Sequence, residues 1–407
     1  MNSKTVDKGN YKLHTYKTDK FKTIDLHVNY SFEALEDLYV VSALKVLLNY
    51  TSEKYRNKID KFIKCEELYD EDLFLSIDRD GRMVTFGLNA SFINPKLVND
   101  DFSEEAITFP FEVFNNPVFD DKDLDFVKRS MKKSYAGINE NPAYIADMNS
   151  KKNFFDDPTA ASFFYVEDEI IDTLTMEQLK EKYEYIINNS NINVFLLGDI
   201  EDKYIDYIDN NIIHKSINKD IDYIYVNKPI DKPVEIEETK KDLKQAQIVL
   251  MYDIDKFDLE EYQKMVLYSR CLGFGMDSRL FSIVREKYQL CYNVDSSTNR
   301  FCSFVRIDTS VDNANIKKTM DAIQESIDDM DNITEDMFEN KKKQIYKSYD
   351  NVYDSLNNIY DEMFNVNVLG LLSCDEKREL VKQIKLDEVK SMKDKYKIHT
   401  IYVLKGE

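Results

Sequence analysis

The chain has 407 residues, enough for two or three domains with a sizeable core, and its 43% hydrophobic and 32% charged content is typical of a folded soluble protein. A formal net charge of −21 argues against nucleic acid as a partner, because phosphate binding depends on Lys and Arg. No apolar run is long enough to cross a membrane and the five cysteines form no C-x-x-C pair, so we expect no membrane span and a cytoplasmic location.

The first half of the chain alternates strand patterns with helix patterns. Apolar and polar residues alternate at 21–28, as in a half-buried strand, and apolar residues then recur at helical spacing. The turn Asp80-Gly81 separates two further strand patterns. The expected elements of this half are helices at 34–50, 54–67, 104–115, 121–136, 143–155 and 176–187, and strands at 73–78, 83–90 and 192–198.

One stretch of the second half, CLGFGMDSRLFSIVREKYQLCYNV at 271–294, combines a glycine pair, a helix pattern and a strand pattern. Gly273 and Gly275 allow the backbone to turn and to approach another segment closely. Asp277 is predicted to cap the helix that follows, because its carboxylate can accept from the free amides of the first turn. Alternating apolar residues predict a strand at 290–294.

Three segments of the first half recur in the second half in the same order, which indicates an internal duplication. The matching pairs are 81–92 with 299–311, 119–135 with 333–349, and 174–199 with 384–407. The sequence therefore predicts two related α+β domains. We place them at 1–215 and 237–407, joined by a polar, proline-containing linker at 216–236.

Residue types that carry chemistry are arranged in no recognisable catalytic pattern. The four histidines (His14, His27, His214 and His399) are too far apart in sequence for a helical zinc motif. His27 and His399 lie in or beside strand patterns, where a packed or exposed side chain is the expected role. No phosphate loop, G-x-S-x-G or complete G-x-G-x-x-G is present. The residues themselves nominate no nucleophile, zinc site or acid–base pair.

The stretch at 271–294 resembles the C-terminal-domain signature of the M16 (pitrilysin or processing-peptidase) metallopeptidases, which reads close to LGGGMSSRLF–VREKRGLAYSV. The matching residues are Gly273, Gly275, Met276, Ser278, Arg279, Leu280, Phe281, Val284, Arg285, Glu286, Lys287, Leu290 and Tyr292. The resemblance implies two homologous domains, each a mostly antiparallel sheet covered by helices, that form half of a clam-shell. It also implies that Arg285 and Tyr292 bind the substrate backbone. Gly273 and Gly275 would form either a tight connection or a loop that contacts substrate.

Active members of that family carry an H-x-x-E-H helix, in which two histidines bind zinc and the glutamate activates water. The corresponding helix here has Ala43, Val46 and Leu47 at the three motif positions. The third ligand, a downstream glutamate, would fall near Lys133–Ser134. None of these side chains serves as a zinc ligand or general base. The resemblance therefore implies a chain with no catalytic residues and no metal or other cofactor of its own.

Two-chain members of the family pair a zinc-bearing subunit with a zinc-less one that supplies the arginine–tyrosine pair. This sequence resembles the zinc-less subunit found beside a catalytic M16 peptidase in low-GC bacteria. The implied partners are a catalytic subunit carrying H-x-x-E-H, which would hold the zinc, and a peptide substrate. Two alternative functions remain open. One is a scaffolding protein that has lost peptidase activity, and the other is a peptide-binding protein such as a carrier of leader peptides.

Overall fold

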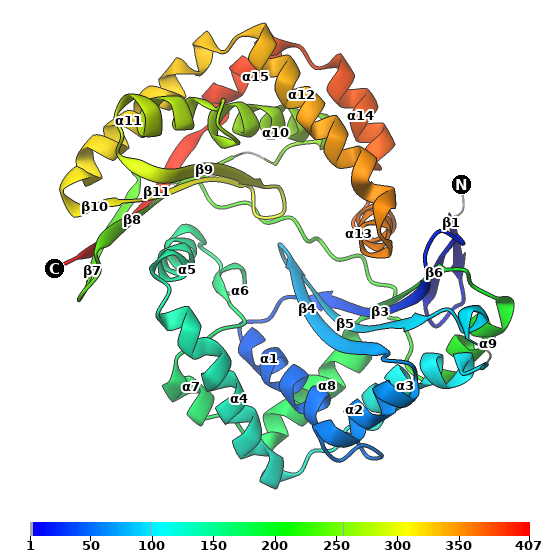
Figure 1. Cartoon of the computed structure of the whole chain (residues 1–407). Helices are drawn as coiled ribbons and strands as arrows, with labels where there is room; N and C mark the ends of the chain where they lie inside the picture. Colours follow the sequence, from blue (N-terminus) through cyan, green and yellow to red (C-terminus); the bar gives the residue numbers. More distant parts are fainter. Residues whose placement is uncertain (1–2, 99, 255) are drawn as a thin grey trace. The chain divides into compact units, whose positions relative to one another are not determined.

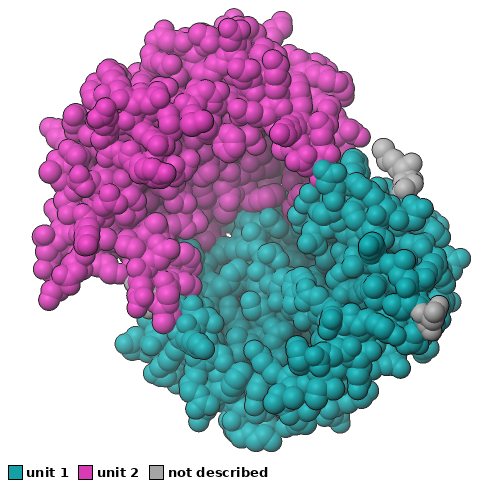
Figure 2. All heavy atoms as spheres, in the orientation of Figure 1, with its two compact units in different colours: residues 1–135, 162–223, 353–364 teal, residues 136–161, 224–352, 365–407 magenta. Residues whose placement is uncertain are grey.

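The computed structural model describes residues 3–98, 100–254 and 256–407 (Figure 1). These residues divide into two compact units, which are coloured separately in Figure 2. Unit 1 comprises residues 1–135, 162–223 and 353–364, and unit 2 comprises residues 136–161, 224–352 and 365–407.

Unit 1 is built on a six-stranded sheet with the order β1-β2-β6-β3-β5-β4. Strands β2 and β6 are parallel, and the other neighbours are antiparallel. The strands are β1 (Ser3–Asp7), β2 (Lys12–Lys17), β3 (Thr23–Glu33), β4 (Asp72–Asp80), β5 (Met83–Ile93) and β6 (Asn191–Gly198). The helices are α1 (Leu38–Tyr50), α2 (Lys58–Glu67), α3 (Ser103–Asn115), α4 (Asp121–Asn139), α7 (Asp168–Asp172), α8 (Met176–Asn189), α9 (Asp202–Asn211) and, from far along the chain, α13 (Leu356–Asn367).

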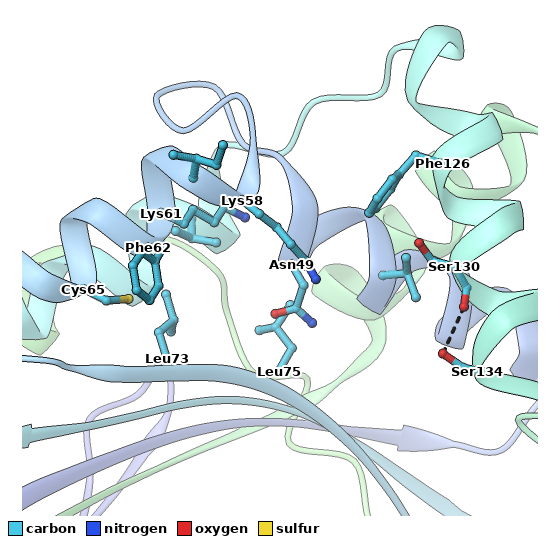
Figure 3. A pocket seen from close by; sticks show the side chains of 13 residues that line it. Asn49, Lys58, Lys61, Phe62, Cys65, Leu73, Leu75, Phe126, Ser130 and Ser134 are labelled. Atoms are coloured by element: carbon cyan, nitrogen blue, oxygen red, sulfur yellow. Dashed lines mark hydrogen bonds between the residues drawn. The ribbon is translucent and has the colours of Figure 1, made fainter. Parts of the chain in front are cut away.

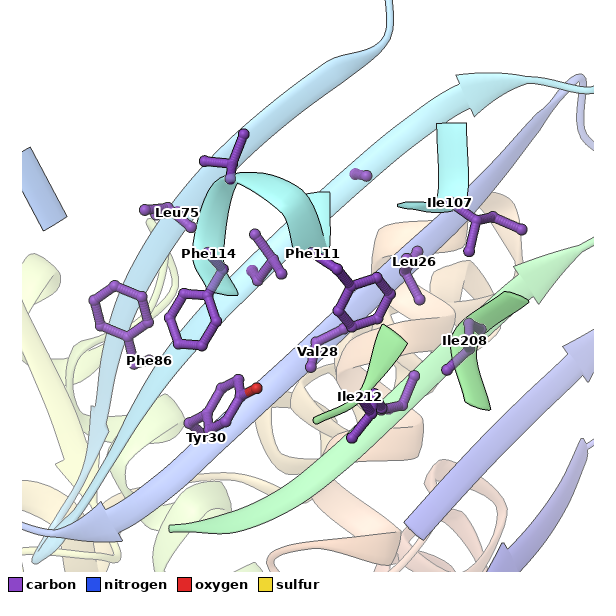
Figure 4. Close-up of a cluster of buried hydrophobic side chains, with 14 of the residues drawn as sticks. Leu26, Val28, Tyr30, Leu75, Phe86, Ile107, Phe111, Phe114, Ile208 and Ile212 are labelled. Atoms are coloured by element: carbon purple, nitrogen blue, oxygen red, sulfur yellow. The ribbon is translucent and has the colours of Figure 1, made fainter. Parts of the chain in front are cut away.

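The helices α1, α3, α8 and α9 bury one apolar face of this sheet. Successive side chains of a strand point to opposite faces, so alternate residues of β3 share one side. Leu26, Val28 and Tyr30 of β3 lie on the covered side, in one buried cluster with Phe111 and Phe114 of α3 (Figure 4). The helix patterns of the sequence therefore correspond to real helices whose apolar stripes meet this sheet.

The opposite face of β3 is polar and is nevertheless buried. Asp25, His27, Asn29 and Ser31 are each at most 6% exposed. The ring of Tyr360 on α13 stacks on His27 with centroids 3.9 Å apart, and the Asn29 amide donates to its hydroxyl at 2.8 Å. The prediction of a half-buried strand is therefore wrong for β3, because a helix more than 300 residues away in sequence covers its polar side.

Unit 2 is built on a five-stranded sheet with the order β7-β11-β8-β10-β9, in which β7 and β11 are parallel. The strands are β7 (Val234–Lys240), β8 (Gln245–Asp253), β9 (Cys291–Asn299), β10 (Phe304–Asp312) and β11 (Lys397–Gly406). The helices are α5 (Pro142–Phe154), α6 (Pro158–Ala161), α10 (Leu259–Gly273), the π-helix η2 (Phe281–Lys287), α11 (Ile316–Asp328), α12 (Glu335–Asp350), α14 (Cys374–Gln383) and α15 (Leu386–Lys390). The short 3-10 turns of this unit are η3 (Asn313–Asn315), η4 (Asp329–Asn332) and η6 (Ser391–Lys395), while η1 (Pro95–Leu97) belongs to unit 1 and η5 (Asn351–Asp354) spans the change from unit 2 to unit 1.

Strand β8 is apolar on both faces, since both faces are covered. Ile248 and Leu250 lie in the main core with α10 and α11, whereas Val249 and Met251 pack against Phe154 of α5. The unbroken run IVLMY is the pattern expected of a strand buried on both sides.

The two sheets have the same topology, as the duplication predicts. The order β2-β6-β3-β5-β4 of unit 1 corresponds to β7-β11-β8-β10-β9 of unit 2, including the single parallel pair in each. The units change over at residue 223, inside the segment predicted as a linker. They differ from the sequence-based domains in two further places, because 136–161 belongs to unit 2 and 353–364 to unit 1.

Candidate functional site

The stretch at 271–294 lies wholly in unit 2 and links α10 to the sheet edge. Helix α10 ends at Gly273, a short turn follows, η2 occupies 281–287, and β9 then forms the edge strand. The helix and the strand expected here are therefore both present. The helix is wider than an α-helix, and π-helical segments of this kind are frequent at functional sites.

Gly273 is fixed by close packing rather than by an unusual backbone angle. A Cβ at this position would lie 2.5 Å from the backbone nitrogen of Ser296 on β9 and 2.9 Å from Cδ1 of Leu280. Gly275 has a φ of +83°, a conformation that glycine adopts without strain. The first glycine thus lets α10 lie against β9, and the second lets the chain reverse.

We expect Gly273→Ala to lower the free energy of unfolding by about 1–3 kcal/mol, the usual cost of forcing an extra group into a packed site. Gly137→Ala on α4 is the matched control, because a Cβ there meets nothing within 4 Å. Removing a helical glycine at an open position should stabilise the protein by about 0.5–1 kcal/mol. Urea denaturation measures the free energy of unfolding of both variants. Equal changes in the two variants would contradict the packing argument.

A buried lysine holds the turn between the two glycines in place. Lys341 of α12 has no exposed surface, and its ammonium donates to the carbonyl oxygen of Phe274 at 2.5 Å and to the Asp277 carboxylate. Phe338 and Ile345 flank it at helical spacing on the buried face of α12. The sequence did not predict a buried role for this residue, because a lysine within a lysine-rich helix is normally solvent-exposed. The sequence pattern that could have indicated its burial is its position between two apolar residues on the same helix face.

The helix cap differs from the prediction. Asp277 is predicted to cap the helix, but its carboxylate accepts a hydrogen bond from the ammonium of Lys341 instead. Ser278 is instead the residue whose hydroxyl accepts from the backbone N–H of Phe281, at 3.4 Å. Ser278 is 1% exposed, so the hydroxyl satisfies a backbone amide that water does not reach.

The structure brings the predicted substrate-binding pair together. The guanidinium of Arg285 lies 4.8 Å from the ring centroid of Tyr292 and 4.6 Å from that of Phe281, so it stands between two aromatic rings. Cation–π contacts of this kind fix the plane of the guanidinium while leaving its N–H groups free of the rings. Tyr292 is 83% exposed, which is unusual for an aromatic side chain on a strand.

The strand that carries Tyr292 is an edge strand. Strand β9 pairs with β10 on one side, and no strand of the described residues pairs with its other side. An edge strand offers free backbone N–H and C=O groups to an extended peptide. Arg285 and Tyr292 therefore present donors beside a backbone edge, which is the chemistry needed to hold a peptide chain.

The degenerate zinc-motif positions lie in unit 1 on α1. Ala43 and Leu47 are fully buried in an apolar cluster with Val127 and Met131 of α4. Lys133–Ser134, the segment expected to correspond to the third ligand, is exposed on α4, and Ser134 lines the same pocket as the motif position Val46. Val127 and Met131 of α4, which pack in the same cluster as Ala43 and Leu47, offer no zinc ligand either.

Elsewhere in the described parts of the chain, His, Cys, Asp and Glu side chains form no group that could hold a metal ion. The histidines are used in packing. His27 bonds the Asn89 side chain at 2.8 Å, His399 bonds Thr400 at 2.9 Å, and burial lowers the pKa of both rings. Both are buried, in agreement with their expected structural role. No described helix has the length and hydrophobicity that crossing a membrane requires.

Comparison with known proteins gives a consistent result. The family model described as "Peptidase M16 inactive domain" matches residues 173–345. The "Probable inactive metalloprotease YmfF" of Bacillus subtilis is 21% identical over 343 residues, covering 80% of this chain and 78% of that protein. The "Non-peptidase homolog YmxG" of Helicobacter pylori is 22% identical over 314 residues, covering 74% and 70%.

Among solved structures, that of a conserved protein from Enterococcus faecalis superimposes with a TM-score of 0.93 at 19% identity, covering 100% of this chain and 99% of that one. The chain therefore shares its fold with this solved structure, and apolar residues occupy the positions aligned with the zinc motif. Over residues 173–345 the chain is similar to the inactive domain of M16 peptidases, and the two relatives named above are likewise described as inactive or as non-peptidase homologues.

Proposed function

We propose that this chain is the non-catalytic subunit of a two-chain M16 zinc peptidase and supplies Arg285 and Tyr292 to bind the peptide substrate. The observation that carries the proposal is the guanidinium held 4.8 Å from an 83% exposed tyrosine ring on an edge strand. A packing role does not account for this exposure. The zinc, the general base and the other half of the peptide chamber would come from an H-x-x-E-H partner subunit.

Within that complex, Arg285 and Tyr292 would donate to carbonyl oxygens of the substrate backbone. Two donors aimed at a carbonyl stabilise the negative charge that develops on it during hydrolysis. Gly273 and Gly275 would shape the loop beside the pair without contributing side chains. The same features would serve a peptide-binding protein that has no peptidase partner, and the experiment below separates the two functions.

The test is reconstitution of this chain with the H-x-x-E-H chain encoded in the same genome. We expect peptide cleavage by the mixture and none by this chain alone. Arg285→Ala with Tyr292→Phe should lower kcat/KM of the complex by about 10²-fold or more, the usual cost of removing transition-state donors. The matched control is Arg129→Ala with Tyr353→Phe, which changes the same residue types at other exposed positions.

Size-exclusion chromatography of the same mixtures supplies the second readout. A complex that forms with both double variants, but cleaves normally only with the control, supports the assignment. Cleavage unaffected by the Arg285/Tyr292 variant would show that the pair has no role in the peptidase. Peptide binding by this chain without any complex would favour the carrier function instead.

A further inference from the structure

A pocket of about 660 Å³ opens on unit 1, whereas the arginine–tyrosine pair belongs to unit 2, and the function proposed above does not use the pocket (Figure 3). It lies between α1, α2, β4 and α4, and its volume is within the range of small-molecule sites. Leu73 and Leu75 of β4, Val113 of α3 and Phe126 of α4 give it apolar walls. Val46, the motif position that is a glutamate in active relatives, is also part of the lining.

Both charged residues that line the pocket are lysines. Lys58 is exposed at the start of α2, and Lys61 one turn later is only 7% exposed. No carboxylate is among the described residues that line it, although the chain as a whole carries a net charge of −21. The pocket is therefore a locally cationic site on an acidic protein, which favours an anionic ligand.

The hydrogen bonding of Lys61 leaves room for a ligand. Its ammonium donates to the carbonyl oxygen of Leu48, near the end of α1 where carbonyl groups lack helical partners. Leu48 is the acceptor that the described residues provide, and an ammonium has three N–H donors. The contact explains how the charge is held, and it leaves donors for an anion in the pocket.

Helix α2 also exposes large apolar side chains at the edge of the pocket. Ile59 is 69% exposed and Phe62 is 62% exposed, and both belong to the lining. Adjacent exposed apolar residues beside a concavity are typical of binding surfaces. The two lysines and these two residues thus alternate along one helix, with positive charge and apolar surface side by side.

We propose that this pocket binds a carboxylate carried on an apolar body, with Lys58 and Lys61 holding the carboxylate and Ile59, Phe62 and the two β4 leucines covering the hydrocarbon. A cationic ligand would be repelled by both lysines. A neutral hydrocarbon would leave the buried ammonium of Lys61 without an anion to compensate it. A free fatty acid and the C-terminus of an apolar peptide share the required chemistry.

Binding should be linked to proton uptake. Burial lowers the pKa of Lys61 to about 7, and a bound carboxylate would restore the charged form of the amine. The ionisable groups near it are Cys65, which opposes the lowering, and Lys58, which adds to it, both on α2. The facing residues of α1, β4 and α4 in the lining are uncharged. At pH 8, a carboxylate should therefore take up a large part of one proton as it binds.

The test is isothermal titration calorimetry of the full chain with decanoate and with decanol, a neutral probe of the same length. We expect decanoate to bind at least tenfold more tightly, and proton uptake to appear as a difference between buffers of different ionisation enthalpy. Equal affinity for the two probes, or no binding of decanoate, would overturn the proposal. An apolar hexapeptide with a free C-terminus, compared with its amide, distinguishes the peptide source from the fatty acid.

Variants locate the site. Lys58→Glu should weaken decanoate binding at least tenfold, whereas Lys180→Glu, the same charge change at an exposed position of α8, should leave it unchanged. Lys61→Met should abolish the proton uptake, but it also removes a contact at the end of α1. Val46→Phe fills the pocket without touching that contact and should abolish binding. Normal binding by both Lys58→Glu and Val46→Phe would show that the ligand binds elsewhere.

Discussion

Lys341→Met is expected to destabilise unit 2 by about 2–3 kcal/mol and to loosen the glycine turn. Methionine keeps most of the buried stem but removes the ammonium that bonds Phe274 and Asp277. The Phe274 carbonyl then lacks this partner, and losing a hydrogen bond to a charged donor costs about 1.5–3 kcal/mol. The side chain of Asp277 is 44% exposed, so water takes over part of its interaction and keeps the loss below that of a fully buried pair.

Urea denaturation measures the stability change, and amide hydrogen exchange at 274–278 measures the local effect. Lys343→Met is the matched control, since Lys343 is exposed on the same helix and its removal should change stability by less than about 0.5 kcal/mol. Equal stability of the two variants would show that the buried ammonium does not hold the turn. If the turn positions Arg285 for substrate, Lys341→Met should also slow peptide cleavage by the reconstituted complex.

Periodicity in the sequence predicted several helices and strands of unit 1 closely. Helices expected at 104–115 and 176–187 are observed at 103–115 and 176–189, and the strand expected at 192–198 is observed at 191–198. Their apolar residues recur at the spacing of a helix or form a short buried run, and this pattern is local in the sequence. Thr175 also forms a capping box with Gln178 at the start of α8.

Contacts between distant parts of the chain could not be predicted in the same way. Tyr360 on α13 covers the polar face of β3, and Phe154 on α5 packs behind β8. Each helix joins the unit opposite to the one suggested by its place in the duplicated sequence. Helical spacing identifies a helix, but it does not identify the sheet that the helix will cover.

In the candidate site, too, the sequence did not predict which residues contact each other. The family resemblance identified Arg285 and Tyr292, and the structure places them in contact. It did not identify Lys341, because no sequence pattern distinguishes a buried lysine from the exposed lysines beside it. Nor did it identify Val127 and Met131 of α4, which pack in one buried cluster with Ala43 and Leu47 of α1.

Glu71→Gln is expected to stabilise the protein by up to about 3 kcal/mol at pH 7. Glu71 follows α2 in a turn where Tyr69 and Asp70 both have positive φ, and it is 3% exposed. Neither of its carboxylate oxygens has a hydrogen-bond partner among the described residues. Burial without a partner raises the pKa of Glu71 from 4.5 to about 9, so the folded protein holds the neutral acid at pH 7.

Because the pKa of Glu71 is raised in the folded protein, the free energy of unfolding decreases as the pH rises. Between pH 4.5 and 9 the unfolded chain ionises Glu71 while the folded chain keeps its proton, so the folded state loses stability as the pH rises. Each pH unit costs about 1.4 kcal/mol, which over the interval from 4.5 to 7 amounts to about 3 kcal/mol. Glutamine has no proton to lose and is free of this cost.

Denaturation curves of the wild type and Glu71→Gln at pH 5 and pH 7 test the argument. The advantage of the variant should be small at pH 5 and largest at pH 7, whereas Glu66→Gln, an exposed neighbour on α2, should show no such trend. A constant difference at both pH values would mean that Glu71 has an ordinary pKa in the folded protein. Because Glu71 lies in the turn after α2, its neutral state would also leave the positive charge of the lysine-lined pocket on that helix undiminished.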